Sequence, residues 1–146
     1  GFLSAILEKG RRALSITISQ DGAMTAGGFI LPNDRVDVIR TFRDEAASRS
    51  GGGEVMQTEI VLRNVRVLAI GQNVQEKNGE RVVTGTTATL DLSPEEVELV
   101  ALAQRTGQLS LALRSIVDTN ETGNAKKKVD KMTIIRFGVP GSTVQQ

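Results

Sequence analysis

Two stretches of sequence and the turn between them decide the fold. The stretches are QTEIVLRNVRVLAI at residues 57–70 and RVVTGTTATLDL at residues 81–92, and the turn is Lys77-Asn78-Gly79. Apolar and polar residues alternate along both stretches, which is typical of half-buried β-strands. The Asn-Gly pair suits the positive φ angles of a tight hairpin turn. We therefore predict a hairpin of two strands, in which Gly71 ends the first strand.

The first of these strands changes the face on which its apolar residues lie. Ile60 and Leu62 have one parity, whereas Val65 and Val67 have the other. A strand can bury both pairs on the same side only if its backbone is offset between them. The sequence therefore predicts a bulge or bend near Arg63-Asn64.

A helix is predicted directly after the hairpin. In Ser93-Pro94-Glu95-Glu96 the serine can cap the first turn, the proline fits that turn, and the second glutamate completes a capping box. We expect the helix to run to about Thr106 and to stop at Gly107. Its apolar residues form a wide stripe suited to lying across a sheet: Val97, Leu99, Val100, Leu102 and Ala103.

Shorter alternating segments complete the expected domain. Further strands are predicted at Arg11–Ser19, Arg35–Thr41, Leu109–Arg114 and Met132–Phe137. Residues 43–54 combine charges, small residues and three consecutive glycines, which indicates a mobile loop. Residues 118–131 are polar and charged, which favours disorder. The fold class expected is mainly β (α+β): a small multi-stranded β domain with one capped helix.

Composition excludes most catalytic chemistry. The 146 residues include no His, Cys, Trp or Tyr, so a Ser-His-Asp triad, a thiol nucleophile, a structural zinc site and a disulfide are all excluded. The formal net charge of +1 and the four Phe residues give no case for nucleic-acid binding. We therefore expect no enzyme, no catalytic residue, no cofactor and no metal ion.

The densest motif is AGGFILPNDRVDV at residues 26–38. Its glycines, proline and asparagine are ordinary turn residues, so the favoured interpretation is a tight corner with its charges in solvent. The functional interpretation is a loop that presents Asp34, Arg35 and Asp37 to a partner, with Phe29 as a fourth partner-binding candidate. Open sheet edges in such a fold would also suit a homo-oligomer or a partner that adds a strand.

Five segments follow one another in an order that is characteristic of a known family. They are GRRALSI at residues 10–16, AGGFILPNDRVDVI at 26–39, NVRVLAIGQ at 64–72, ATLDLSPEE at 88–96 and LVALAQRTGQLSLALR at 99–114. Together they resemble the CpaB/RcpC family of Flp (tight adherence, Tad) type IV pilus assembly proteins. The second segment departs from that family's pattern at Asn33, where Gly is usual, and Asn tolerates a left-handed turn position.

The resemblance implies a periplasmic protein of the bacterial cell envelope, anchored in the inner membrane by an N-terminal helix that is absent from this chain. The implied role is non-enzymatic assembly of the pilus machine, by contacting or gating the outer-membrane secretin. The expected organisation has four parts. Residues 1–9 are a junction from a SAF (β-clip) region that lies mostly outside the chain, and residues 10–114 are an RcpC-type domain. A mobile polar loop follows at 115–131, and a closing strand and tail at 132–146.

Two other functions stay open. A β-clip relative could bind glycan, here peptidoglycan, although the chain has no Trp or Tyr on which a sugar could stack. An enzyme related to SAF-containing sugar-acid proteins is the other alternative, and no set of residues in the sequence supports it.

Overall fold

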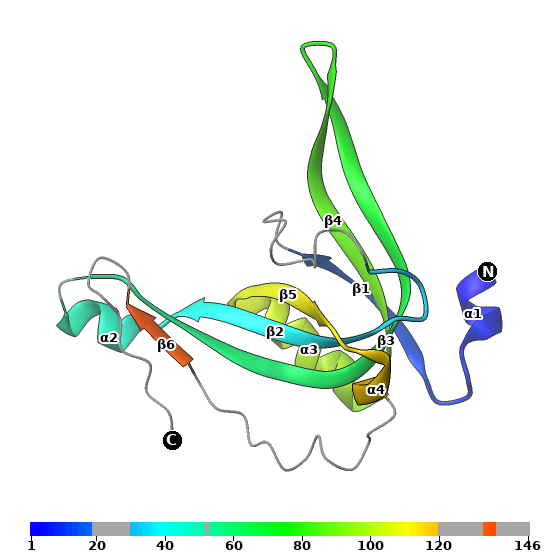
Figure 1. Cartoon of the computed structure of the whole chain (residues 1–146), viewed down its shortest axis with the longest axis horizontal. Helices are drawn as coiled ribbons and strands as arrows, with labels where there is room; N and C mark the ends of the chain where they lie inside the picture. The colour runs from blue at the N-terminus through cyan, green and yellow to red at the C-terminus, as the bar shows by residue number, and fades with distance from the viewer. Residues whose placement is uncertain (19–29, 52, 120–132, 137–146) are drawn as a thin grey trace.

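A curled antiparallel sheet forms the body of the protein, and a long hairpin projects from it (Figure 1). The computed structural model describes residues 1–18, 30–51, 53–119 and 133–136. The elements in chain order are α1 (Phe2–Ile6), β1 (Arg12–Ile18), β2 (Arg35–Arg43), α2 (Glu45–Ser50), β3 (Val55–Lys77), β4 (Glu80–Leu92), α3 (Pro94–Thr106), β5 (Gln108–Leu113), α4 (Ile116–Thr119) and β6 (Thr133–Arg136).

The strand order is β1-β4-β3-β2-β5, and β6 pairs with the beginning of β3. Strands β1 and β5 end this order, yet they also contact each other, so the sheet curls on itself. Helix α3 lies against the curled sheet and contacts all five of these strands (Figure 1). The expected fold class, mainly β with a capped helix, is confirmed.

The core lies between the sheet and α3. It contains the alternate residues that point inward from the strands, together with two residues of the helix: Ile16, Ile18, Val36, Val38, Val65, Val67, Ala88, Leu90, Leu92, Leu109, Leu111, Val100 and Ala103. Helix α3 begins as predicted, because the Ser93 side chain accepts from the Glu96 N–H and the Glu96 side chain accepts from the Ser93 N–H. The predicted stripe was too wide, since Leu99 and Leu102 remain 46% and 63% exposed.

The bulge predicted in the first hairpin strand is confirmed. Asn64 has a φ of 58°. Val38 pairs with Leu62 and Val36 pairs with Val65, so β3 uses one more residue than β2 between these two pairs. The inserted residue brings Val65 to the buried side, where it is 4% exposed.

The mobile loop predicted at residues 43–54 is wrong, because residues Glu45–Ser50 form α2. The Asp44 carboxylate caps the helix by accepting from the Ala47 N–H at 2.9 Å, and it also accepts from the Gln57 side chain. Ser48 is buried and its hydroxyl accepts from the Val55 N–H at 3.0 Å. Such a short helix is held mainly by these contacts with β3, which the local sequence does not reveal.

The prediction that Gly71 ends its strand is also wrong. Gly71 pairs with Thr87, and the two strands continue together to the pair Lys77 and Glu80. The turn itself is confirmed at Asn78 and Gly79, whose φ angles are 54° and 79°. We call residues 71–85 the arm (Figure 1).

Several expectations fall on residues that the structure does not describe. These are Phe29, residues 120–131 of the predicted polar loop, and the tail at 137–146. Within the described part of that loop, residues Ile116–Thr119 form α4. Strand β6 confirms the last predicted strand over Thr133–Arg136.

Candidate functional site

The motif at residues 30–38 forms the turn that leads into β2, and Asp34 stabilises this turn. Its carboxylate accepts from the Leu31 N–H at 2.8 Å, while its own N–H donates to the Leu31 carbonyl at 3.0 Å. Asn33, with a φ of 74°, donates its N–H to the Val67 carbonyl at 2.7 Å. Asp34 is thus an Asx-turn residue whose carboxylate is already used within the chain.

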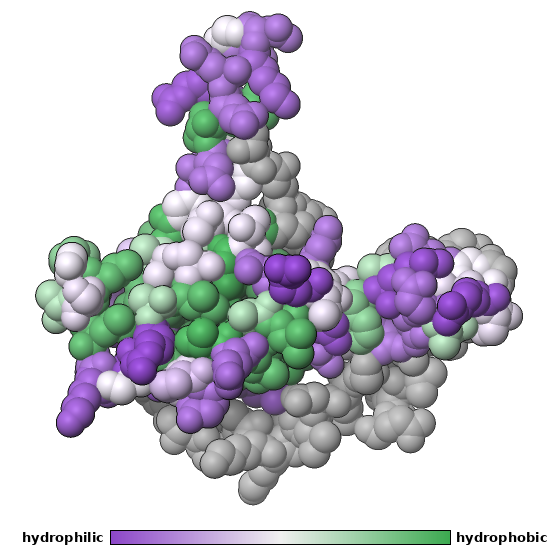
Figure 2. All heavy atoms as spheres, turned by 180° about the vertical axis from the view of Figure 1, so that it is seen from behind, coloured by the Kyte–Doolittle hydropathy of each residue, from purple (hydrophilic) through white to green (hydrophobic). Residues whose placement is uncertain are grey.

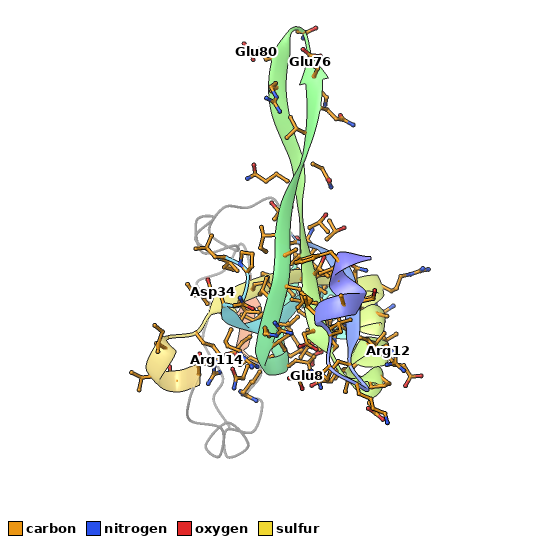
Figure 3. The ribbon with its side chains drawn as sticks, turned by 90° about the vertical axis from the view of Figure 1, so that its right-hand side faces the viewer. Glu8, Arg12, Asp34, Glu76, Glu80 and Arg114 are labelled. Carbon is orange, nitrogen blue, oxygen red and sulfur yellow. The ribbon has the colours of Figure 1, made fainter. Side chains whose placement is uncertain are left out.

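Asp37 stabilises a second part of the fold. Its Oδ1 accepts from Arg114 Nη1 at 2.8 Å and from the Asn64 N–H at 3.0 Å. Arg114 also donates to the Asp118 carbonyl in α4 at 3.1 Å. The Asp37 carboxylate therefore joins β2 to the bulge of β3 and, through Arg114, to α4. Figure 3 shows Arg114 and Asp34 on the same side of the arm's base.

Arg35 has a different environment from its two acidic neighbours. Its Nη1 donates to the Asn64 carbonyl at 3.1 Å, and no carboxylate of a described residue pairs with it. Its side chain lines a polar hollow of about 540 Å³, which we call the arginine hollow. The residues that line the arginine hollow are Ile6, Glu8, Arg11, Arg35, Asn64, Val65, Arg66, Asp91 and Glu96.

Asp91 holds the other two arginines of the hollow. It accepts from Arg11 Nε at 2.8 Å and from Arg66 Nη2 at 3.0 Å, and its side chain is 10% exposed. Burial raises the pKa of Asp91, but the hydrogen bonds and charges of Arg11 and Arg66 outweigh it and lower the pKa below its usual range. Asp91 is therefore ionised at neutral pH, and the guanidinium groups of its two partners are committed to it.

The structure thus separates the candidate residues. Asp34 and Asp37 are bound within the chain, whereas Arg35 keeps donors that face the arginine hollow. The sequence reasoning missed Arg66 and Asp91. Counting outward from the Asn-Gly turn also places Arg66 opposite Asp91, but it agrees with the structure only because the two register shifts that lie between them cancel.

A second, apolar groove lies between α3 and the sheet. Leu99, Leu102 and Val61 line it, and the ion pair between Arg40 and Glu59, at 2.8 Å, forms part of its wall. Its volume is about 280 Å³. Figure 2 shows hydrophobic side chains gathered on this rear face of the body, in contrast to the hydrophilic tip of the arm.

Chemically, the arginine hollow is suited to binding an anionic group. A guanidinium has five N–H donors in a planar arrangement, and within the described part of the chain the Arg35 guanidinium donates one hydrogen bond, to the Asn64 carbonyl. Over the same residues, no group of three or more acidic, His or Cys side chains could hold a metal ion. No described helix is both long and apolar enough to cross a membrane.

A comparison with known protein families gives a match over most of the chain. The model of a family described as Flp pilus assembly protein RcpC/CpaB matches residues 1–114. The matched residues include the whole arginine hollow and the arm. No curated protein and no solved structure matches the chain.

Proposed function

The chain belongs to the RcpC/CpaB family of Flp pilus assembly proteins, and we propose that it serves this assembly as a non-enzymatic periplasmic adaptor that contacts the outer-membrane secretin. In this proposal a preceding segment anchors the protein in the inner membrane, and residues 1–9 join the domain to a SAF region. The arginine hollow is the surface on which the partner docks.

The position of Arg35 supports this proposal. Arg35 is the charged residue of its motif whose side chain lines the arginine hollow. Its guanidinium pairs with no carboxylate of the described residues. Arg11 and Arg66 are fixed by Asp91 on the other side of the hollow, so they shape it, whereas the Arg35 guanidinium has no such carboxylate partner among the described residues. A carboxylate of a partner would accept two parallel hydrogen bonds from such a guanidinium.

Two of the three acidic residues of the hollow, Asp91 and Glu96, favour binding over catalysis. A general acid needs a pKa near the working pH, whereas the pKa of Asp91 is lowered by its arginine partners. Glu96 completes the capping box of α3 and lies 3.8 Å from Arg11. These two carboxylates therefore have structural partners, and the sequence has no His or Cys to supply a proton shuttle or a nucleophile in their place.

Charge reversal of Arg35 tests the proposal. The substitution Arg35→Glu is introduced into the natural protein in a piliated strain, and Arg49→Glu serves as the control because Arg49 is exposed in α2, outside the hollow. We expect Arg35→Glu to abolish piliation and co-purification of the secretin at an unchanged protein level, while Arg49→Glu preserves both. Normal piliation with Arg35→Glu would contradict the proposal.

A further inference from the structure

The turn at the end of the arm places an Asn-Gly pair in water. Asn78 and Gly79 are the two residues between Lys77 and Glu80, which form the last pair of the two strands. Residues 71–82 are all exposed, and the tip of the arm stands clear of the body in two views (Figures 1 and 3). Asparagine is among the chemically labile residues of proteins, because its side-chain amide can react with the backbone nitrogen that follows it.

The backbone nitrogen of Gly79 is open to such a reaction. Strand pairing ends at Lys77 and Glu80, so the Gly79 N–H takes no part in the ladder. A Cβ added at Gly79 would meet nothing within 4 Å, and glycine has no side chain of its own, so the space beside this nitrogen is open. The Asn78 side chain is exposed as well, and water therefore reaches both reacting groups.

The reaction also requires the turn to open. In the closed turn Asn78 and Gly79 have φ angles of 54° and 79°, both in the left-handed region. The Gly79 nitrogen can reach Asn78 Cγ only when it rotates to the side of the Asn78 Cβ, and a two-residue hairpin turn does not allow this rotation. The ribbon that holds the turn is weak, because two strands alone are marginally stable in water and Val74 and Val82 stay 41% and 39% exposed. Such an element opens locally at little cost in free energy.

We propose that Asn78 is a site of spontaneous deamidation. The Gly79 nitrogen loses its proton to water or hydroxide and attacks Asn78 Cγ, so that a new C–N bond forms. The bond between Cγ and Nδ2 then breaks, and Nδ2 takes a proton from water and leaves as ammonia. Water opens the resulting succinimide ring: hydrolysis at Cγ leaves aspartate on the normal backbone, whereas hydrolysis at the backbone carbonyl leaves isoaspartate, in which the chain continues through Cγ. This inference goes beyond the docking of a partner at the arginine hollow and does not depend on it.

Either product changes the charge of the tip. Two acidic and two basic residues flank the turn, with Glu80 opposite Lys77 and Glu76 opposite Arg81, so their formal charges cancel. Deamidation adds a negative charge to this balanced group. Isoaspartate also adds a methylene group to the backbone, which a two-residue turn cannot absorb without losing the pairing beside it. The charge and the order of the tip therefore change with the age of the protein molecule.

Incubation of the natural protein in warm buffer at several pH values tests the proposal. Samples are digested at intervals, and chromatography with mass spectrometry separates the asparagine, aspartate and isoaspartate forms of the peptide that contains Asn78. Asn73 is the matched internal control, because it is exposed on the same arm but is followed by the branched Val74. We expect deamidation at Asn78 to be at least about fivefold faster than at Asn73. Its rate should rise with pH, because the attacking nitrogen reacts without its proton.

A reversible lock on the tip tests the requirement for opening. The chain has no Cys of its own, so the double substitution Glu76→Cys, Arg81→Cys allows a single disulfide across the arm. Antiparallel neighbours have Cα atoms about 4.5–5.5 Å apart, which is within the range of a disulfide. We expect the oxidised form to deamidate at Asn78 at least about fivefold more slowly than the same protein after reduction, because the disulfide restricts the open tip. No product at Asn78, equal rates at Asn78 and Asn73, or equal rates in the oxidised and reduced forms would each overturn the proposal.

Discussion

Gly107 joins α3 to β5 at a point where a side chain has no room. Its φ is −176°, an extended conformation open to any residue, so conformational freedom does not explain the glycine. A Cβ there would lie 2.6 Å from the Thr41 carbonyl oxygen and 2.8 Å from Arg40 Cγ. The Thr41 backbone is fixed in β2, and Arg40 is held by Glu59 at 2.8 Å, so neither neighbour moves away freely.

We therefore expect Gly107→Ala to destabilise the fold strongly. Overpacking costs about 1–3 kcal/mol, and a fixed backbone oxygen places this case near the upper end. The smaller backbone entropy of alanine in the unfolded chain offsets part of this, about 0.5 kcal/mol. The net loss is about 2 kcal/mol in the free energy of unfolding, which lowers the Tm of a chain of this size by about 6–8 °C.

Far-UV circular dichroism with urea and heat measures this loss, because the chain has no Trp or Tyr to report by fluorescence. Gly85→Ala is the matched control, since its added Cβ would meet only one side-chain atom, at 3.7 Å. We expect the control to stay within about 0.5 kcal/mol of the natural chain or to be more stable. A Gly107→Ala variant as stable as the control would refute the reasoning from the close contact.

Three further predictions concern the arginine hollow, the helix cap and the core. Asp91→Asn should lower the free energy of unfolding by about 2 kcal/mol, because it weakens charge-assisted bonds to two arginines. Since folding lowers the pKa of Asp91, its contribution is complete above the unfolded pKa of about 3.9 and is lost as the pH falls through the lower folded value. When Tm is measured from pH 2 to 7, the Tm of the variant should thus fall less steeply at acid pH than that of the natural chain. An equal fall of Tm in both proteins would contradict this. Ser93→Ala should lower the free energy of unfolding, measured with urea, by about 1 kcal/mol, because the α3 cap is lost. An unchanged urea midpoint would show that the cap does not stabilise the fold. Val100→Ala, at a fully buried position, should cost about 2 kcal/mol in the same assay, whereas exposed Leu102→Ala should cost under about 0.5 kcal/mol. Similar losses for the two variants would contradict the placement of α3.

The features that the sequence predicted well are those determined by neighbouring residues. The turn at Asn78-Gly79 depends on two residues that tolerate positive φ, and α3 depends on its Ser93 cap. The bulge at Asn64 followed from a change of parity in a single strand. Each of these signals lies within a few residues of the feature that it specifies.

The features that the sequence did not predict depend on contacts between distant residues. Helix α2 is held by Ser48 against β3, and the continuation of β3 past Gly71 depends on its pairing with β4. The distinction between Arg35 and its acidic neighbours is of the same kind. Asp37 is engaged by Arg114, which lies 77 residues further along the chain, and no local pattern reveals such a contact.

The most direct test of the adaptor function is a binding measurement between the natural protein and the periplasmic part of the secretin. Calorimetric titration compares the unchanged protein with the Arg35→Glu and Arg49→Glu variants. We predict that the unchanged protein and Arg49→Glu bind with the same Kd, and that Arg35→Glu binds at least about tenfold more weakly, a loss of about 1.4 kcal/mol. Equal Kd values for all three proteins, or no binding by the unchanged protein, would contradict the account.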